Sequence, residues 1–364
     1  MSENSTVIDN TTASENLRVH KDSVVSENLT IPQCIKMILN LRDKQSNIDS
    51  NSILDIKNNS RLYKIFLEHD SCSWVSREIK FTNDRNHYIN FNADEKKLIK
   101  TIVSFFLVGD GPIVSNIIYK FLLEANSITE QAWYISQAQR EVVHSLVYSM
   151  FLDEIAITHL DRQEILNIAN NSEYVNRKLE FMRKYTLEDT TDPSIPYVAS
   201  CCSEGVFFVS NFPPIYWFGT KGLIPGFVQG NVLISRDENK HREWFGEMAN
   251  TVRPDDISPW IEIIKEAVEI ESLTADEIRD ITVGNINRTN TLQFIRFAAD
   301  VVCKILKIPT IYNVSDPYSW MSAINNSVRI ENQQEIKTTS YNTTTLNKVS
   351  SGDPYLNPLS IRYN

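Results

Sequence analysis

Apolar residues at helical spacing fill the middle of the chain, whereas both ends are polar. Residues 1–60 are rich in Ser, Asn, Thr and Asp, with one amphipathic piece near Ile31–Leu41, and predict a largely flexible extension with one docked helix. From about Glu331 the chain again becomes rich in Asn, Thr and Ser, so residues 331–364 are predicted to form a flexible tail. The pattern therefore predicts one folded domain over residues 61–330.

Capping residues mark the starts of the first two long helices in this domain. Asn92 and Glu95 form a capping-box pair, in which each side chain binds the other residue's backbone N–H. The helix that follows is apolar on too many sides for a surface helix, so we expect it to be buried. Ser127 and Glu130 form a second capping box, which opens the helix that contains Tyr148.

Further helices are expected along the rest of the domain. The stretch Asp161–Thr186 predicts one rather polar helix. The apolar stretch Val198–Phe212 predicts another, which the two following prolines break or kink. Pro225 precedes the next helix, and two more complete the core, the second opened by Thr274 and Glu277. Together with a glycine count of only 10, these helices predict an all-α fold.

Charge, hydropathy and cysteine content argue against several classes of protein. The net charge is −10 without a basic cluster, which disfavours nucleic-acid binding. We find no apolar run that approaches the roughly 20 residues of a membrane span, and no signal-peptide pattern at the start. The cysteines are odd in number and include no C-x-x-C pair, which fits a reduced, cytoplasmic setting. They are Cys34, Cys72, Cys201, Cys202 and Cys303.

Two Glu-x-x-His pairs are the strongest chemical signal in the sequence. Glu141 and His144 lie three residues apart on one predicted helix, and Glu238 and His241 repeat the spacing on another. Tyr148 follows His144 by one helical turn. A single pair of this kind is usually a solvated helix face. Two pairs, with one further carboxylate from each of two other helices, would build a two-metal site inside a four-helix bundle.

Two isolated acids in apolar surroundings could supply the missing carboxylates. Asp110 stands between two glycines in the apolar helix, and Glu204 stands among small and aromatic residues. A buried acid without a partner costs several kcal/mol or becomes protonated, so pairing or metal binding is expected. For Asp110 the alternative is the N-cap of a restarted helix, because Pro112 follows two residues later.

The candidate ligand set therefore contains four carboxylates and two histidines, and no thiol. Such a set suits iron or manganese. Each ligand histidine needs an acceptor for its second ring N–H, and Asp237 is the predicted partner of His144. An ordinary surface ion pair between Asp237 and Arg236 is the alternative. The six candidate ligands are Asp110, Glu141, His144, Glu204, Glu238 and His241.

Trp74 and the remaining histidines carry weaker signals. Trp74 precedes a charged segment, and packing at the end of the bundle is its ordinary explanation. Four histidines have no comparable partners in the pattern, and we expect no special role for them. They are His20, His69, His87 and His159.

Four motifs together resemble the small subunit of class I ribonucleotide reductase, over about residues 61 to 341. They are Phe105-Phe-x-x-x-Asp-Gly111, Glu141-x-x-His-x-x-x-Tyr148, Glu204-Gly-x-Phe-Phe208 and Ser235-Arg-Asp-Glu-x-x-His241. The segments Ile215-Tyr-Trp217 and Lys221-Gly-Leu-Ile-Pro225 favour the branch of eukaryotes and large DNA viruses. The resemblance implies a ferritin-like helical bundle with a di-iron carboxylate site.

The resemblance also implies a cofactor and a radical. The six ligands would hold two iron ions in an oxo-bridged centre, and Tyr148 would become a stable tyrosyl radical after reaction with O₂. Phe208, Phe212 and Ile234 match the apolar pocket that shields this radical in the family. The shielding is needed because solvent or a nearby reductant would quench the radical.

A transfer route and partners follow from the same resemblance. Trp74, Asp237 and His144 match the family's route for electrons and protons between the metal centre and the surface. Tyr341 matches the tail tyrosine that passes the oxidising equivalent to the large catalytic subunit, which would reduce ribonucleoside diphosphates. We expect a homodimer that binds the large subunit through its C-terminal tail.

The sequence departs from the family pattern at two places. After the first ligand, relatives usually read Asp-Gly-Ile-Val-x-Glu-Asn, where this chain has Asp110-Gly-Pro-Ile-Val-Ser-Asn116. Pro112 removes one helical hydrogen bond and is expected to bend the helix near the metal. The chain end Asn357–Asn364 lacks the acidic ending with a final Phe that is usual in relatives.

Two other functions use similar features. A di-iron oxidase or desaturase has the same bundle and similar ligands, but the place of Tyr148 beside His144 favours a radical generator. A non-catalytic companion subunit could lose ligands without consequence, whereas this chain keeps all six.

Overall fold

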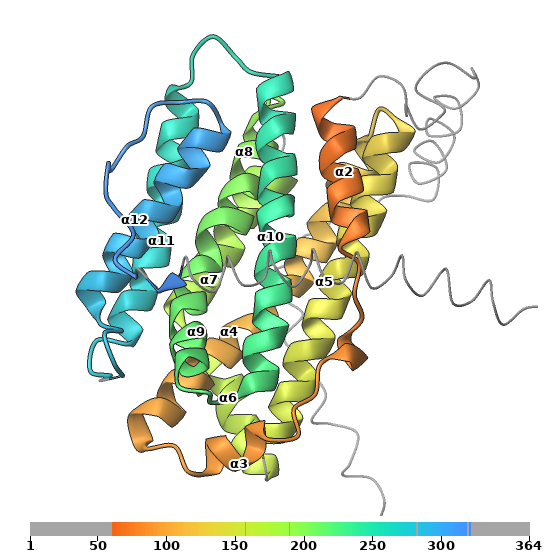
Figure 1. Cartoon of the computed structure of the whole chain (residues 1–364). Helices are drawn as coiled ribbons and strands as arrows, with labels where there is room; N and C mark the ends of the chain where they lie inside the picture. Colours follow the sequence, from red (N-terminus) through yellow and green to blue (C-terminus); the bar gives the residue numbers. More distant parts are fainter. Residues whose placement is uncertain (1–59, 157, 189, 282, 319, 322–364) are drawn as a thin grey trace, which may run out of the picture. The chain divides into compact units, whose positions relative to one another are not determined.

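The structure is a computed structural model that describes residues 60–321 apart from residues 157, 189, 282 and 319 (Figure 1). The predicted N-terminal extension and C-terminal tail therefore lie almost wholly outside the described residues. Within the described residues the secondary structure is helical except for one isolated bridge between Val283 and Ile286, so the all-α prediction is confirmed. The longer helices are α2 (Arg61–Ser71), α4 (Ala93–Asn116), α5 (Ile128–Ile155), α6 (His159–Asn171), α7 (Glu173–Met182), α8 (Ile195–Cys202), α9 (Phe212–Thr220), α10 (Pro225–Thr251), α11 (Ser258–Glu277) and α12 (Arg288–Ile305).

The predicted helix starts of α4, α5 and α10 are confirmed. The Asn92 side chain accepts from the Glu95 N–H at 2.9 Å, and Glu95 accepts from the Asn92 N–H at 2.9 Å. Ser127 Oγ accepts from the Glu130 N–H at 3.2 Å and begins α5. Pro225 is the first residue of α10, where its missing N–H costs nothing.

Helix α4 is continuous through Asp110 and Pro112, so the alternative of a helix that restarts at Asp110 is wrong. Its side chains pack against α5, α6 and α7, and the buried packing holds the helix together across the proline. The helix changes to a π-helical segment, η3 (Ile117–Leu122), one turn beyond Pro112. The change to π-helical geometry therefore comes after Pro112, and the helix is not interrupted at Asp110.

The expectation that no segment is long and apolar enough to span a membrane needs correction. By length and composition alone, the helical stretch Ala93–Leu122 would be long enough and apolar enough to cross one. In the structure 59% of its most apolar window is buried inside the protein. The stretch is apolar because it is a central helix of the bundle, covered by neighbouring helices on several sides.

Two helix boundaries differ from prediction. The polar stretch expected as one helix is divided at Ser172, whose extended backbone (φ −79°, ψ 121°) ends α6 and precedes α7. Thr274 and Glu277 do not open a helix but lie in the last turn of α11. Thr274 is buried inside α11, so its hydroxyl is not at a helix start. Asn287 caps the last helix instead, accepting from the Asn290 N–H at 3.0 Å.

A third prediction also differs from the structure: the stretch Val198–Phe212 is not one helix broken by the following prolines. Regular α-helical geometry ends at Cys202, and the prolines lie in the first turn of α9. The chain between α8 and α9 forms a π-helical turn, η5 (Ser203–Phe207), followed by a 3₁₀ turn, η6 (Val209–Asn211). π-helical turns are often found at functional sites, and η5 carries Glu204. Gly205 is required here because a Cβ would lie only 2.4 Å from Arg242 Cδ and 2.7 Å from Val302 Cγ2.

A buried ion pair supports this irregular segment. Lys178 Nζ on α7 lies 2.6 Å from Glu271 Oε2 on α11, and it donates to the Phe207 carbonyl oxygen at 2.6 Å, at the end of η5. Ser210 donates to the other Glu271 oxygen. Burial lowers the pKa of Lys178, and burial raises the pKa of Glu271 to about 7 despite the lysine charge.

The first turn of α10 is held by a separate helix, α3 (Asp84–Ile89). The carboxylate of Asp84 accepts from the Gly226 N–H at 3.0 Å and from the Phe227 N–H at 2.7 Å. His87 Nδ1 accepts from the Ile224 N–H at 3.0 Å. Ile224 has a positive φ of 40°, which is strained for a β-branched residue. These contacts from α3 satisfy the otherwise free N–H groups and hold the strained residue in place.

Candidate metal centre

Helices α5 and α10 pack together and bring the two Glu-x-x-His pairs to one place. Each pair lies on one helix face because its members are three residues apart. All four side chains are buried, with Glu238 the most exposed at 4%. The centre is therefore shielded from bulk solvent by the two helices that supply most of it. The members of the pairs are Glu141 and His144 on α5, and Glu238 and His241 on α10.

Each of the two paired glutamates reaches both histidines, with one oxygen for each. Glu141 Oε2 lies 3.2 Å from His144 Nδ1, and Glu141 Oε1 lies 2.9 Å from His241 Nδ1. Glu238 repeats the arrangement, with Oε1 3.1 Å from His144 Nδ1 and Oε2 2.9 Å from His241 Nδ1. The two Nδ1 atoms are thus connected twice through carboxylates, as two bridged cations would require.

Glu204 lies on the His241 side of this arrangement. Its Oε2 is 3.9 Å from His241 Nδ1, and its Oε1 accepts from Gln137 Nε2 at 2.9 Å. One ligand atom from each of Glu141, Glu204, Glu238 and His241 lies within 4.8 Å of the others. The four groups could therefore surround one metal ion.

Two oxygen atoms of this group suit a metal ion better than a hydrogen-bond donor. Glu141 Oε1 and Glu204 Oε2 are buried and make no hydrogen bond, although His241 Nδ1 lies 2.9 Å from the first and 3.9 Å from the second. A buried carboxylate oxygen without a donor costs free energy, and a cation would remove that cost. The residues present thus fit a metal centre, and carboxylate with imidazole suits iron or manganese.

The charges of the centre determine how it is protonated. Burial would lower the pKa of His241, but Glu141 and Glu238 together raise it to about 9. Burial also opposes the charge on His144, yet Glu238 and its other carboxylate neighbours raise the pKa of that ring well above its usual value. Burial, reinforced by the neighbouring glutamates, raises the pKa of Glu204 well above its ordinary value. Metal binding must therefore displace protons, and it becomes weaker as the pH falls.

The side chain of Asp110, the sixth predicted ligand, lies outside the described part of the structure. Its backbone is in the middle of α4, which packs against α5. Its role as a ligand stays a prediction.

Asp237 connects Trp74 to His144. Asp237 Oδ2 accepts from Trp74 Nε1 at 2.7 Å and lies 3.2 Å from His144 Nε2. The Trp74 and His144 rings are stacked, with centroids 6.1 Å apart. Arg236 Nε is 3.8 Å from the other Asp237 oxygen, but Asp237 is only 1% exposed. The alternative of a surface ion pair is therefore wrong.

Tyr148 is fully buried one helical turn beyond His144. Its hydroxyl donates to Asn231 Oδ1 at 3.1 Å, and the Asn231 amide nitrogen in turn donates to the Phe227 carbonyl at 2.8 Å. The Phe106 ring lies parallel to the Tyr148 ring, with centroids 4.4 Å apart and an interplanar angle of 3°. The hydroxyl is thus oriented by a polar contact while the ring is enclosed by an apolar one.

The three residues predicted to shield Tyr148 are all buried. Phe208 and Phe212 each place their ring centroid 6.0 Å from that of Phe106. Ile234 lies on α10, one turn after Asn231. Phe208 and Phe212 thus form an aromatic cluster with Phe106, the ring that covers Tyr148, and the shielding role of Ile234 stays a prediction.

Several buried residues of the centre were not predicted. Gln137 lies four residues before Glu141, so its position on the same helix face could have been predicted from the spacing. Asn231 lies three residues before Ile234, so its position on the same helix face could also have been predicted. His69 gave no signal, because the ring that it contacts, His241, lies 172 residues further along the chain.

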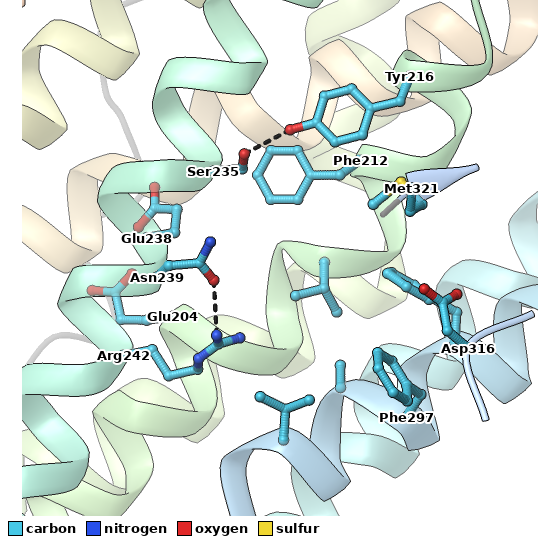
Figure 2. Close-up of a pocket in the computed structure, with 14 residues that line it drawn as sticks. Glu204, Phe212, Tyr216, Ser235, Glu238, Asn239, Arg242, Phe297, Asp316 and Met321 are labelled. Carbon is cyan, nitrogen blue, oxygen red and sulfur yellow. Dashed lines mark hydrogen bonds between the residues drawn. The ribbon is translucent and has the colours of Figure 1, made fainter. Parts of the chain in front are cut away.

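A cavity of about 180 Å³ adjoins the centre. Figure 2 shows Glu204 and Glu238 on one side of this cavity and Phe297, Asp316 and Met321 on the other. Arg242 donates to the Asn239 side chain at 2.8 Å along its wall. The cavity therefore leads from α12 and the chain that follows it to two of the candidate ligands.

The tail residue Tyr341 lies outside the described residues, as do His20 and Cys34. The described cysteines Cys72, Cys201, Cys202 and Cys303 are all free thiols.

Comparison with known proteins identifies the family. The family model described as ribonucleotide reductase, small chain, matches residues 51–317. The protein is 27% identical to the ribonucleoside-diphosphate reductase small chain of Spisula solidissima, over 72% of its own length and 69% of that relative. It is 29% identical to a small chain of Arabidopsis thaliana (72% and 80% covered) and 26% identical to the small chain of Variola virus (72% and 82% covered).

Solved structures confirm the bundle. The Rnr4 homodimer of Saccharomyces cerevisiae matches with a TM-score of 0.68 at 21% identity, over 83% of this protein and 99% of that one. Dimanganese(II)-NrdF of Streptococcus sanguinis matches with a TM-score of 0.65 at 20% identity, over 74% and 94%. The motifs that suggested the family, the ferritin-like fold that they implied and the match across most of the domain all agree, and the chain belongs to the ribonucleotide reductase small-chain family.

Proposed function

We propose that this chain is the radical-generating small subunit of a ribonucleoside-diphosphate reductase. Its centre would hold two iron ions, and Tyr148 would store the oxidising equivalent as a tyrosyl radical. The large catalytic subunit would use that equivalent to reduce ribonucleotides to deoxyribonucleotides. The small chains of the family carry the name of this activity, and the setting we propose is the cytoplasm.

One observation carries this proposal: Glu141 and Glu238 each place one oxygen beside each histidine. Two carboxylates that bridge two imidazoles would provide two metal positions. Glu204 would complete the position beside His241, and Asp110 is proposed to complete the other. The four negative charges of these carboxylates would balance the charges of two divalent cations.

The metal pair, when bound, would supply the oxidising power that comes from O₂. The protein side chains have other tasks. Glu141 and Glu238 would fix the separation of the two ions, and Gln137 holds Glu204 by its other oxygen. The cavity beside Glu204 and Glu238 would admit a small molecule such as O₂.

Tyr148 would lose an electron to the centre, and its position one helical turn from His144 supports this role. Asn231 holds its hydroxyl hydrogen, and Phe106 excludes water from the ring. The chain from His144 through Asp237 to Trp74 would carry an electron and hold a proton between the centre and the segment that follows α2. Burial would raise the pKa of Asp237, but the hydrogen bond from His144 lowers it, so the carboxylate is ionised and can hold that proton.

Removal of individual ligands tests the metal centre. The purified chain is expected to bind about two iron ions, whereas Glu204→Ala and His241→Ala should each lower the iron content, because a carboxylate or imidazole donor is lost. Iron per chain would be measured by inductively coupled plasma mass spectrometry after anaerobic loading and desalting. Glu243→Ala on the same helix and His159→Ala on the surface are matched controls. Unchanged iron content in both ligand variants would refute the centre.

We also propose a homodimer that binds the large subunit through residues 331–364, with Tyr341 on the radical path. A chain truncated after Ile330 should keep its iron but lose nucleotide reduction with the large subunit. Tyr341→Phe should keep affinity for the large subunit and lose turnover, because only the phenol oxygen is removed. Binding and turnover would be measured by surface plasmon resonance and by deoxynucleotide formation. Full turnover by the truncated chain would exclude both roles of the tail.

A further inference from the structure

His69 is a buried histidine in direct contact with the proposed metal centre. It lies on α2, outside the helices that carry the predicted ligands, and its side chain is fully buried. Its Nε2 is 3.3 Å from His241 Nε2, and its Nδ1 is 3.2 Å from Ser136 Oγ. The ring also packs on Trp133, with centroids 4.9 Å apart. Both ring nitrogens thus have a partner, and the orientation of the ring is fixed.

The contact determines which nitrogen of each ring carries hydrogen. Two facing nitrogens form a hydrogen bond only if one of them is protonated and the other is not. His241 must keep Nδ1 free for a metal ion, because Nδ1 is the atom beside Glu141 and Glu238. A neutral His241 then carries its hydrogen on Nε2. His69 must accept that hydrogen on its own Nε2, so its hydrogen is on Nδ1 and is donated to Ser136.

The two proposed ligand histidines therefore have different outer partners. His144 Nε2 faces the carboxylate of Asp237 at 3.2 Å, whereas His241 Nε2 faces a neutral imidazole. A carboxylate acceptor makes a ligand imidazole more basic and a better donor to a metal than a neutral acceptor does. The two metal positions would consequently be unequal, although each takes its histidine from a Glu-x-x-His pair.

We propose that His69 is a positioning residue of the metal centre, which holds His241 in the tautomer that directs Nδ1 to the metal and, being uncharged, leaves that position the weaker of the two. The inference rests on the proposed function, since it needs the metal centre to exist. It adds an interaction that lies outside the ligand set and outside the contact between His144 and Asp237.

The test uses Mn(II) as the probe, with free Mn(II) counted by electron paramagnetic resonance during anaerobic titration of the whole chain. The unmodified chain should bind two ions with unequal dissociation constants. His69→Leu removes the hydrogen-bond acceptor. It should raise the dissociation constant of one Mn(II) ion by about 10- to 100-fold and leave that of the other unchanged within about twofold. His69→Gln offers a neutral carbonyl acceptor and should restore most of the loss. His159→Leu, a surface histidine change, is the control.

Several results would overturn the inference. Unchanged binding in His69→Leu, or equal weakening in the Leu and Gln variants, would show that the acceptor is not what matters. If His69→Leu lowered the affinity for both Mn(II) ions equally, in proportion to a lower thermal stability of the metal-free chain, His69 would have a merely structural role. If His69→Leu does not fold, Ser136→Ala is used in its place. This variant should lower the affinity for the same Mn(II) ion, but by a smaller factor. Unchanged binding in Ser136→Ala would then refute the inference.

A parallel titration of His241→Ala separates this inference from the proposed function. If His241→Ala binds two ions as the unmodified chain does, the metal centre itself is wrong. If His241→Ala loses one ion while His69→Leu binds normally, the centre stands and only the role of His69 is refuted.

Discussion

Replacement of Tyr148 by phenylalanine is expected to leave the iron content unchanged and to abolish both the tyrosyl radical and nucleotide reduction. The hydroxyl oxygen is the only heavy atom removed, and its contact with Asn231 is lost with it. The stacking on Phe106 depends on the ring and should persist. Without a phenol, the pocket offers no group at this position that can hold the oxidising equivalent. We expect turnover with the large subunit to fall below the detection limit.

Low-temperature electron paramagnetic resonance after addition of ferrous iron and O₂ would measure the radical directly. Tyr216→Phe is the matched control, because Tyr216 is as deeply buried as Tyr148. Its hydroxyl lies 2.6 Å from Ser235 Oγ and 3.0 Å from the Asn231 backbone oxygen, and it does not contact the Asn231 side-chain oxygen that binds Tyr148. This control should retain the radical. A normal tyrosyl signal in Tyr148→Phe would place the radical elsewhere and would favour a di-iron oxidase over a radical generator.

The largest effect on stability is expected from Lys178→Met. The change leaves the buried carboxylate of Glu271 without its cation, and it removes the donor to the Phe207 carbonyl. Loss of one partner of a buried ion pair typically costs about 3–5 kcal/mol. We expect a loss of this size in the free energy of unfolding of the metal-free chain, measured by urea denaturation.

A double variant distinguishes the unpaired charge from the lost packing. Lys178→Met combined with Glu271→Leu should recover most of the lost stability, since no buried charge remains. Lys184→Met is the surface control: Lys184 is half exposed and pairs with Glu266 at 2.9 Å, so its loss should cost less than about 1 kcal/mol. A cost below about 1 kcal/mol for Lys178→Met would show that the pair does not support the π-helical turn η5.

The helix starts that could be predicted from sequence depend on contacts within a few residues. The caps at Asn92 and Ser127 and the proline at the start of α10 are all of this kind. The pair Thr274 and Glu277 has the same local pattern but lies at the end of α11, a helix that packs against α7, α8 and α12 and in which Thr274 is buried. Local chemistry allows a helix to start there, and tertiary packing decides that it does not.

The candidate centre divides in a similar way. Glu141, His144 and Tyr148 share a helix face, so their proximity follows from spacing alone. Glu141 and Glu238 face each other, each with one oxygen toward each histidine. This arrangement depends on how α5 and α10 pack, which residue spacing does not predict. His69 shows the limit most clearly, because α2 and α10 meet only in the folded chain.

The way in which α3 holds the first turn of α10 has a mechanical consequence. Asp84 grips the helix at Phe227, about 6 Å along the axis from Asn231 and about 21 Å from His241, at a rise of about 1.5 Å per residue. Were that grip to loosen and the helix to tilt by about 3°, the displacement would be about 0.3 Å at Asn231 but about 1 Å at His241. Because α10 is anchored near Asn231 and Tyr148 while His241 lies far along it, a small tilt would displace His241, at the proposed metal centre, several times farther than Asn231.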